Sequence, residues 1–427
     1  MAINVTRRIL VPAREDGLCE THGFHYASHE GLTLINRRSI TGESDFSSGG
    51  IEERLSPDNG RTWGVWKSVY SKYLDTVGED EIEYIGRADT WNPVHRHYVG
   101  CYFSRFFWGG HKAAYEKLWS SSEKVLFDHQ YLITRREGEE EPFLQQLVKY
   151  EDGAEFDRNN PRNMDFLDRN RGFLNAPWVA SNGDVLMPVG LPMSTACQMA
   201  GLDVSRVFPS CPDTMRGVLI LRAVWNGERY DMHFSEPIVI SDLKSSRGFD
   251  EPIVTELSSG RILLVARGSN VRFPAWNTRI EPGTPGFKWH AWSDDGGRTF
   301  TEAMPWHFDT GEVVYSSATI SQFIRDFRTG RLYWVGNVTG PEVDGNFPRW
   351  PLHIAQVDDE RGCLLRDTLT VIDTRRDDEP DKLQLSNFGL YQDRETGDFR
   401  VTLSKLGQFG QEQVFKSDCM EYLISID

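Results

Sequence analysis

The chain has 427 residues, of which 39% are hydrophobic and 12% aromatic, and its 63 acidic residues outnumber 47 basic ones to give a net charge of −16. This composition is too apolar for a disordered chain, and no run reaches the roughly 18 to 20 apolar residues of a membrane-spanning helix. The negative charge argues against a nucleic-acid backbone as partner, so any anionic ligand must be held by a local group of arginines.

In chain order, the expected elements are short β-strands separated by Gly, Asp, Asn and Pro turns. A strand is expected at 5–11, and the clearest helix signal lies at 112–121. One pattern recurs along the chain: an extended segment, a Gly-centred turn and a second extended segment. Its turns lie at Gly31, Gly183, Gly260, Gly330 and Gly397.

Hairpins that recur at intervals of roughly 70 residues are typical of a β-propeller, in which each repeat forms one four-stranded blade. The expected fold class is therefore all-β, a six-bladed β-propeller, with seven blades as the alternative. No linker rich in Pro, Gly or Ser divides the chain, so residues 1–427 are expected to form a single domain. The expected blades are 22–75, 80–150, 172–243, 249–308, 312–374 and 384–427, with strand 5–11 completing the last.

Two octapeptides, at 56–63 and 293–300, share the pattern S-x-D-x-G-x-T-[W/F]. The pattern is typical of a tight hairpin in which the Asp side chain accepts turn amides, the Gly adopts a positive φ and the terminal aromatic residue packs beneath the turn. These residues are expected to be structural rather than catalytic. The pattern resembles the Asp box of sialidases and related propellers, and with it most of the chain resembles the sialidase superfamily.

The resemblance implies a pocket at the propeller axis. In that superfamily three arginines bind the substrate carboxylate, an Asp is the general acid, and a Tyr activated by a Glu is the nucleophile. Residues 248–257 and the strand that ends at 267 resemble the strand pair of the fourth blade, which gives Glu251 as the catalytic carboxylate and Arg267 as a carboxylate-binding arginine. Arg349 matches the third arginine. Arginine suits such a site because its planar fork pairs with a carboxylate through two hydrogen bonds.

Two blades depart from the superfamily pattern. In the first blade, His25 stands where an arginine is expected, and Arg38, or Arg37, matches the arginine that follows. Asp45 lies in a loop of small residues at the place of the general acid, with a turn-forming role as the alternative. In the last blade, Asn387 stands where the nucleophilic Tyr is expected, so the Tyr-linked covalent route lacks its phenol.

Three functions follow from these residues. The preferred one is a sialidase-like exo-glycosidase that hydrolyses a terminal anionic sugar, with Asp45 as acid and Glu251 as base or nucleophile. The second is a propeller-fold polysaccharide lyase, in which an arginine neutralises a uronate and a His or Tyr removes the C5 proton; the histidines of 22–25, which include His25, and of 95–98 are its candidates. The third is a glycan-binding propeller without turnover.

The expected partner is a carbohydrate substrate, without cofactor, metal, nucleic acid or membrane span, and the number of subunits is left open. Residues 1–8 lack the apolar core of a secretory signal. The chain is therefore expected to be cytoplasmic as given, or secreted or periplasmic if it has been processed.

Overall fold

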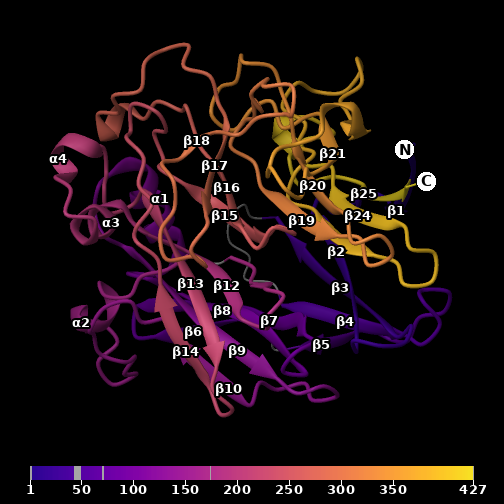
Figure 1. Ribbon diagram of the computed structural model, residues 1–427, viewed down its shortest axis with the longest axis horizontal. Coiled ribbons are helices and arrows are strands. Elements are labelled where there is room, and N and C mark those ends of the chain that lie inside the picture. The colour runs from indigo at the N-terminus through magenta and orange to yellow at the C-terminus, as the bar shows by residue number, and fades with distance from the viewer. Residues whose placement is uncertain (1, 43–49, 70–71, 174, 427) are drawn as a thin grey trace. The chain divides into compact units, whose positions relative to one another are not determined.

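The computed structural model describes residues 2–42, 50–69, 72–173 and 175–426, and these residues form six sheets (Figure 1). Within each sheet the strands are neighbours in chain order, except that the N-terminal strand joins the sheet of the C-terminal strands. The prediction of an all-β, six-bladed β-propeller is confirmed, with each sheet as one blade. The alternative with seven blades is not what the described residues form.

Contacts within the chain divide it into two compact units. Unit 1 comprises Met1–Tyr70, Pro285–Lys288 and Pro305–Asp427, and unit 2 comprises Ser71–Thr284 and Trp289–Met304. The single domain over 1–427 stays a prediction.

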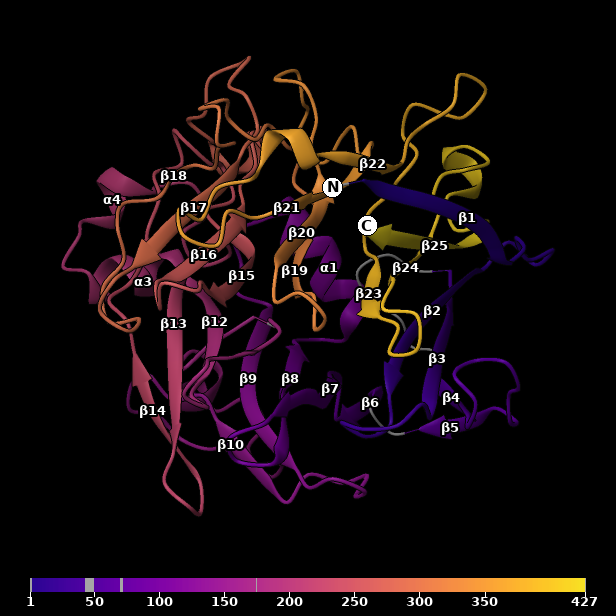
Figure 2. The same ribbon diagram turned by 45° about the vertical axis from the view of Figure 1, so that its right-hand side comes forward.

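Unit 1 contains the first, fifth and sixth blades. In the sixth blade, the N-terminal strand pairs with the C-terminal one from Ile3 opposite Ile426 to Val11 opposite Cys419, as expected for the strand that completes the last blade (Figure 2). The strands are β2 (Cys19–Tyr26), β3 (Leu34–Thr41), β4 (Ile51–Ser56) and β5 (Lys67–Val69); β19 (Ser321–Arg325), β20 (Leu332–Asn337), β21 (Leu352–Gln356) and β22 (Thr370–Asp373); and β23 (Gly389–Gln392), β24 (Phe399–Ser404), β25 (Cys419–Ile426) and β1 (Ile3–Val11).

Unit 2 contains the second, third and fourth blades. The strands are β6 (Lys72–Val77), β7 (Asp80–Asn92), β8 (His97–Phe107), β9 (Leu126–Arg135) and β10 (Leu144–Leu147); β11 (Trp178–Val179), β12 (Val185–Pro192), β13 (Arg216–Trp225) and β14 (Tyr230–Phe234); and β15 (Asp250–Glu256), β16 (Ile262–Arg267), β17 (Lys288–Ser293) and β18 (Met304–Pro305). The expected end of the first blade at residue 75 is wrong, because β6 pairs with β7 and gives the second blade five strands.

The helices are short. They are α1 (His111–Ser120), α2 (Met164–Leu167), α3 (Met193–Met199) and α4 (Val204–Val207), with 3₁₀ turns at Pro274–Trp276, Arg366–Thr368 and Gln411–Gln413. The helix expected at 112–121 is α1, displaced by one residue. None of the helices in the described ranges is long and apolar enough to cross a membrane.

Each unit has its own apolar core. In unit 2 the strand β12 is buried at all eight positions, which explains its continuous run of apolar residues, because a strand covered on both faces has no solvent side. It packs with β13 in a cluster that contains Val189, Leu191 and Leu219. In unit 1 the corresponding cluster joins the fifth and sixth blades through Tyr333 and Tyr422.

Both octapeptides form the same hydrogen-bonded turn. The Ser56 hydroxyl donates to Asp58 Oδ1 (2.8 Å) and accepts the Gly60 N–H (2.7 Å), while Asp58 accepts the Thr62 N–H (2.8 Å) and hydroxyl (2.7 Å). The bonds from Thr62 and Ser56 lower the pKa of Asp58 to about 2. The same four bonds recur at Ser293, Asp295, Gly297 and Thr299, at 2.7, 2.9, 3.0 and 2.7 Å. The Ser, Asp and Thr side chains of both octapeptides therefore hydrogen-bond within their turns, which is the structural role that the sequence predicts.

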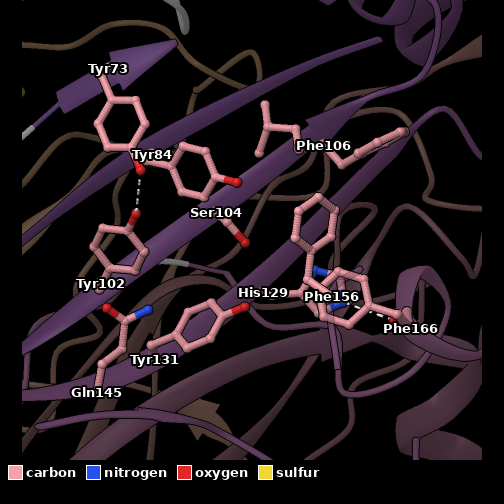
Figure 3. Close-up of a pocket in the computed structure, with 11 residues that line it drawn as sticks. Tyr73, Tyr84, Tyr102, Ser104, Phe106, His129, Tyr131, Gln145, Phe156 and Phe166 are labelled. Atoms are coloured by element: carbon pink, nitrogen blue, oxygen red, sulfur yellow. Dashed lines mark hydrogen bonds between the residues drawn. The ribbon is translucent and has the colours of Figure 1, made fainter. Parts of the chain in front are cut away.

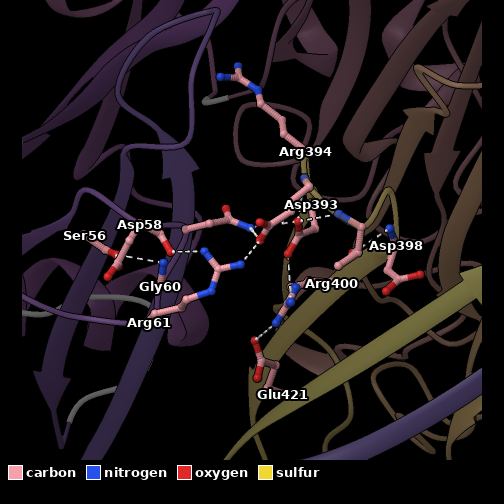
Figure 4. A network of polar contacts seen from close by, with 12 residues as sticks. Ser56, Asp58, Gly60, Arg61, Asp393, Arg394, Asp398, Arg400 and Glu421 are labelled. Carbon is pink, nitrogen blue, oxygen red and sulfur yellow. Dashed lines mark hydrogen bonds and ion pairs between the residues drawn. The ribbon is translucent and has the colours of Figure 1, made fainter.

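The first of these turns also joins the first blade to the sixth (Figure 4). Asn59 donates to Asp393 (3.0 Å), and Arg61 pairs with Glu395 (2.5 Å). Asp393 in turn pairs with Arg400 (2.7 Å). The first and last blades of the chain are therefore held together within unit 1 by these polar contacts.

Candidate functional site

The fourth blade begins with two adjacent carboxylates that share one arginine. Arg267, at the end of β16, pairs with Asp250 (2.7 Å) and with Glu251 (2.8 Å) at the start of β15. Glu251 has a φ of 43°, and the pairing of β15 with β16 is irregular just after Asp250. The left-handed backbone is uncommon for a residue other than Gly, and such outliers gather at functional sites. The sequence-predicted pair Glu251 and Arg267 is therefore in direct contact.

A second group of charges lies across the second and third blades. Asp128, on β9, receives two hydrogen bonds from Arg105 on β8 (2.7 and 3.1 Å) and one from Arg216 at the start of β13 (2.8 Å). Only 2% of the Asp128 side chain is exposed. Both guanidinium groups also lie over the ring of Phe173, at 4.5 Å for Arg216 and 5.4 Å for Arg105. This carboxylate fixes two arginines that come from different blades.

Backbone contacts connect this group to the fourth blade. The Phe249 N–H donates to the Arg216 carbonyl (2.8 Å), which places Arg216 beside the segment that leads into β15. The close approach requires Gly248, because a Cβ there would lie 2.1 Å from the Arg216 carbonyl oxygen, and its φ is 70°. Arg247 completes the set by pairing with Asp250 (3.1 Å). We call Arg105, Asp128, Arg216, Arg247, Asp250, Glu251 and Arg267 the charged cluster of unit 2.

The electrostatics of the cluster keep its aspartates ionised. Burial alone acts to raise the pKa of Asp250, but Arg267, Arg247 and Arg216 together lower it below its ordinary value. Burial likewise acts against ionisation of Asp128, and Arg105 and Arg216 reverse that effect, so its pKa is lowered as well. The aspartates hold the arginines in place. The side chains of Glu251 and Arg267 are partly exposed, at 28% and 11%. The cluster can therefore offer positive charge to an anion next to an accessible carboxylate.

Arg38 lies in a charged group of the first blade, in unit 1. It donates to Glu52 (2.8 Å) and Glu20 (3.3 Å), and its guanidinium lies 4.2 Å from the centre of the Trp66 ring. The same Glu20 lies 3.0 Å from Nε2 of His22. Burial opposes ionisation of Glu20, but its bonds with His22 and Arg14 lower its pKa.

The structure does not place His25 beside Arg38. The register of β2 and β3 sets His22 opposite Arg38 and His25 opposite Ile35. Side chains alternate between the faces of a strand, so His25 lies on the face opposite to that of Arg38. The neighbouring Arg37 shares the face of His25 and pairs with Glu53.

Arg349 and the segment before Asn387 lie together in unit 1. Arg349 Nη1 donates to the Gln384 side chain (2.8 Å) and lies 3.5 Å from the Ser386 hydroxyl. Asn337 donates to the carbonyls of Arg349 (3.2 Å) and Leu385 (3.1 Å), which holds the two segments together. Asn387 itself is exposed and has a φ of 57°.

Two further sets of expected residues stand apart. Asp45 lies outside the described residues. His97 is 5% exposed, and its Nε2 lies 2.7 Å from the Tyr230 hydroxyl. Burial, with a smaller effect of His95, lowers the pKa of His97 to about 4. In the ranges that the structure describes, no three His, Cys, Asp or Glu side chains are grouped to hold a metal ion.

Sequence reasoning missed five members of the charged cluster, namely Arg105, Asp128, Arg216, Arg247 and Asp250. The one available signal was for Asp250, which directly precedes Glu251 in the segment that resembles the family. The others come from separate strands, and no local spacing joins them.

No protein-family model matches the chain, and no curated protein matches its sequence. Solved structures do match. A crystal structure of a protein of unknown function from Dyadobacter fermentans DSM 18053 has a TM-score of 0.55 at 14% identity, with 99% of both chains covered. The intramolecular trans-sialidase from Ruminococcus gnavus, in complex with oseltamivir carboxylate, has a TM-score of 0.52 at 10% identity, with 98% of this chain and 94% of that chain covered.

The NanB sialidase from Streptococcus pneumoniae has a TM-score of 0.50 at 10% identity, with 97% of this chain and 69% of that chain covered. Identities this low carry the fold and leave the chemistry of the site to its own residues. The chain has the fold of a sialidase-like, six-bladed β-propeller.

Proposed function

We propose that the protein is a sialidase-like glycoside hydrolase that removes a terminal anionic sugar from a glycan. Glu251 acts as base or nucleophile, Arg267 binds the carboxylate of the sugar, and Arg38 and Arg349 are the further arginines that the resemblance assigns to it. Asp45 is the general acid. The single observation that carries the proposal is the contact between Arg267 and Glu251, because it joins an anion-binding group to an accessible carboxylate.

Glycoside hydrolysis needs one carboxyl group that is protonated and one that is ionised. Glu251 pairs with the Arg267 guanidinium at 2.8 Å, and we assign the base or nucleophile to it and the acid to another residue.

The arginines support an anionic sugar. An arginine held by a buried carboxylate keeps its position without a ligand, so a substrate carboxylate pairs with a guanidinium that is already ordered. Asp128 orients Arg216, and Asp250 orients Arg247 and Arg267. Asn387 is assigned to the sugar-binding surface as a hydrogen-bonding residue in place of the Tyr, whereas His25, on the strand face opposite to that of Arg38, is left out of this assignment.

The lyase alternative receives less support. It needs a base that reaches the C5 proton of a uronate. His97 is buried against Tyr230 and Trp225, and burial lowers its pKa to about 4, so it is a weak base that a ligand does not reach.

The experiment is a panel of 4-methylumbelliferyl glycosides of sialic acid, uronic acids and neutral hexoses at pH 5 to 8. We expect fluorophore release from an anionic member and a loss of about 10² to 10⁴-fold in kcat for Glu251→Gln, the usual contribution of a positioned acid or base. The matched control is Glu302→Gln, since Glu302 is an exposed carboxylate that pairs with the exposed Lys244. It should keep full activity.

Undiminished turnover by Glu251→Gln would remove that residue from the reaction. Absorbance near 232 nm from a uronate polymer, without fluorophore release, is the outcome that would favour elimination. Glycan retention on an array with no product from any substrate would leave the binding-only alternative.

A further inference from the structure

A cavity of about 310 Å³ opens on one face of the second blade, in unit 2 (Figure 3). Four tyrosines form much of its wall, one from each of the neighbouring strands β6, β7, β8 and β9: Tyr73, Tyr84, Tyr102 and Tyr131. Three phenylalanines and an isoleucine complete the apolar part, and Ser104, His129 and Gln145 add polar atoms. None of the proposed catalytic residues that the structure describes lines this cavity.

The tyrosine rings form a continuous aromatic surface. Tyr73 stacks on Tyr84 with 4.7 Å between ring centres, and Tyr84 stacks on Tyr102 at 5.8 Å, both with 22° between the ring planes. Tyr102 meets Tyr131 edge to face at 5.7 Å. Figure 3 shows the hydroxyls of Tyr73 and Tyr102 turned toward each other, at 3.4 Å. That long contact uses little of the hydrogen-bonding capacity of either phenol.

The lining that the described residues form is uncharged, because it contains no Asp, Glu, Lys or Arg side chain. Burial raises the pKa of Tyr131 to about 12 and raises those of Tyr84 and Tyr102 as well, so the phenols stay neutral. His129 is fully buried and stacked on Phe166 at 4.1 Å, and its pKa is lowered to about 4, chiefly by burial. Near physiological pH the lining therefore selects against an ionised ligand.

Strand alternation separates the cavity from the charged cluster. Ser104 and His129 face each other across β8 and β9 and line the cavity, while the next pair, Arg105 and Asp128, belongs to the cluster. Successive residues of a strand point to opposite faces of a sheet. The two sites therefore lie on opposite faces of the same blade.

The volume and chemistry of the lining limit the ligand. At about 30 Å³ for each water molecule, 310 Å³ corresponds to about ten waters, which is the space of one small ring with its substituents. Phenols, a Ser hydroxyl and a carboxamide offer both donors and acceptors. An aromatic hydrocarbon would leave these groups without partners, at a cost for each of them. A ring with apolar C–H faces and hydroxyls around its edge satisfies both the rings and the polar atoms.

We propose that this cavity is a non-catalytic binding site for one neutral pyranose unit of a glycan. The proposal does not depend on hydrolysis at Glu251, and it gives the protein a second point of attachment to a carbohydrate. The sugar stacks on the tyrosine rings, and its hydroxyls exchange hydrogen bonds with the phenols, Ser104 and Gln145.

The test is a titration of the intact protein with methyl β-galactopyranoside, methyl α-glucopyranoside and phenol, followed by saturation-transfer NMR and calorimetry. We expect binding of at least one pyranoside. Tyr73→Ala should weaken it about tenfold, since Tyr73 is 44% exposed at the edge of the sheet and its removal deletes a stacking surface without opening the core. Gln145→Trp, at an exposed edge position, should block the cavity and abolish binding.

Two controls make the result specific. Phe327→Ala removes an exposed aromatic residue of unit 1 and should leave the affinity unchanged. Glu251→Gln should also leave it unchanged, and loss of pyranoside binding in that variant would place the sugar at the charged cluster instead. The proposal is overturned if neither pyranoside binds at 50 mM, if phenol binds and the sugars do not, or if both cavity variants bind as the unaltered protein does.

Discussion

Asp128→Asn tests whether the buried carboxylate holds the charged cluster of unit 2 together. The change keeps the shape of the side chain and removes its charge. Asp128 makes three short contacts, with Arg105 at 2.7 and 3.1 Å and with Arg216 at 2.8 Å, and 2% of its side chain is exposed. Removing one partner of a buried ion pair leaves an uncompensated charge, which costs roughly 3 to 5 kcal/mol. We expect a loss of about 4 kcal/mol in the free energy of unfolding.

The chain offers a matched control on its surface. Asp294 accepts two hydrogen bonds from Arg261, at 2.6 and 3.0 Å, as Asp128 does from Arg105, but 63% of the Asp294 side chain is exposed. An exposed pair is worth at most about 1 kcal/mol, so Asp294→Asn should change the free energy of unfolding by no more than that. Urea unfolding followed by tryptophan fluorescence and by far-ultraviolet circular dichroism gives both values, provided that the two probes coincide.

A double variant separates the charge effect from the loss of packing. Replacing Arg105 with Met in the Asp128→Asn background removes one of the stranded guanidinium groups. The double variant should therefore lose less stability than the sum of the two single variants. Equal losses of unfolding free energy for Asp128→Asn and Asp294→Asn, or strict additivity in the double variant, would contradict the role given to the Asp128 charge.

Three other predictions concern the scaffold. His97 stays neutral in the folded chain down to about pH 4 but protonates near pH 6.5 when unfolded. As the pH is lowered from 6.5 to 4, the free energy of unfolding should therefore fall by up to about 3 kcal/mol. In urea titrations, His97→Gln should reduce this dependence on pH. Gly248→Ala should lower the free energy of unfolding by at least about 2 kcal/mol, because it adds a clash with the Arg216 carbonyl to an unfavourable φ. Gly260 also has a positive φ but has open space around it, so Gly260→Ala measures the effect of φ alone. Equal losses of stability in the two variants would contradict the clash. Ser56→Ala should cost about 1 to 2 kcal/mol by leaving the buried turn without its hydroxyl, and an unchanged melting curve would count against this role.

The blades and their turns were open to prediction because the signals for them are local. The turns around Gly183 and Gly260 connect consecutive strands, and each octapeptide contains both partners of the four hydrogen bonds that close its turn. The prediction that residues 72–75 of β6 belong to the first blade was wrong, because the sequence of a strand does not determine which neighbouring strand it pairs with.

The charged cluster could be predicted only in part, and for a physical reason. Glu251 and Arg267 were found through a resemblance within one hairpin, whereas Asp128 and Arg216 are 88 residues apart and meet only after two blades have packed. The face of His25 depends on the register of its hairpin, which the sequence of the strand alone does not set.

The most direct measurement compares an aryl glycoside of an anionic sugar with its methyl ester, in which one added methyl group removes the charge of the carboxylate. Charge-assisted hydrogen bonds contribute roughly 1.5 to 3 kcal/mol each, so loss of two of them at an arginine such as Arg267 should lower kcat/KM for the ester by at least about 100-fold. We predict this preference for the free acid and its loss in Arg267→Gln. Equal turnover of acid and ester, or a preference that Arg267→Gln leaves intact, would contradict it.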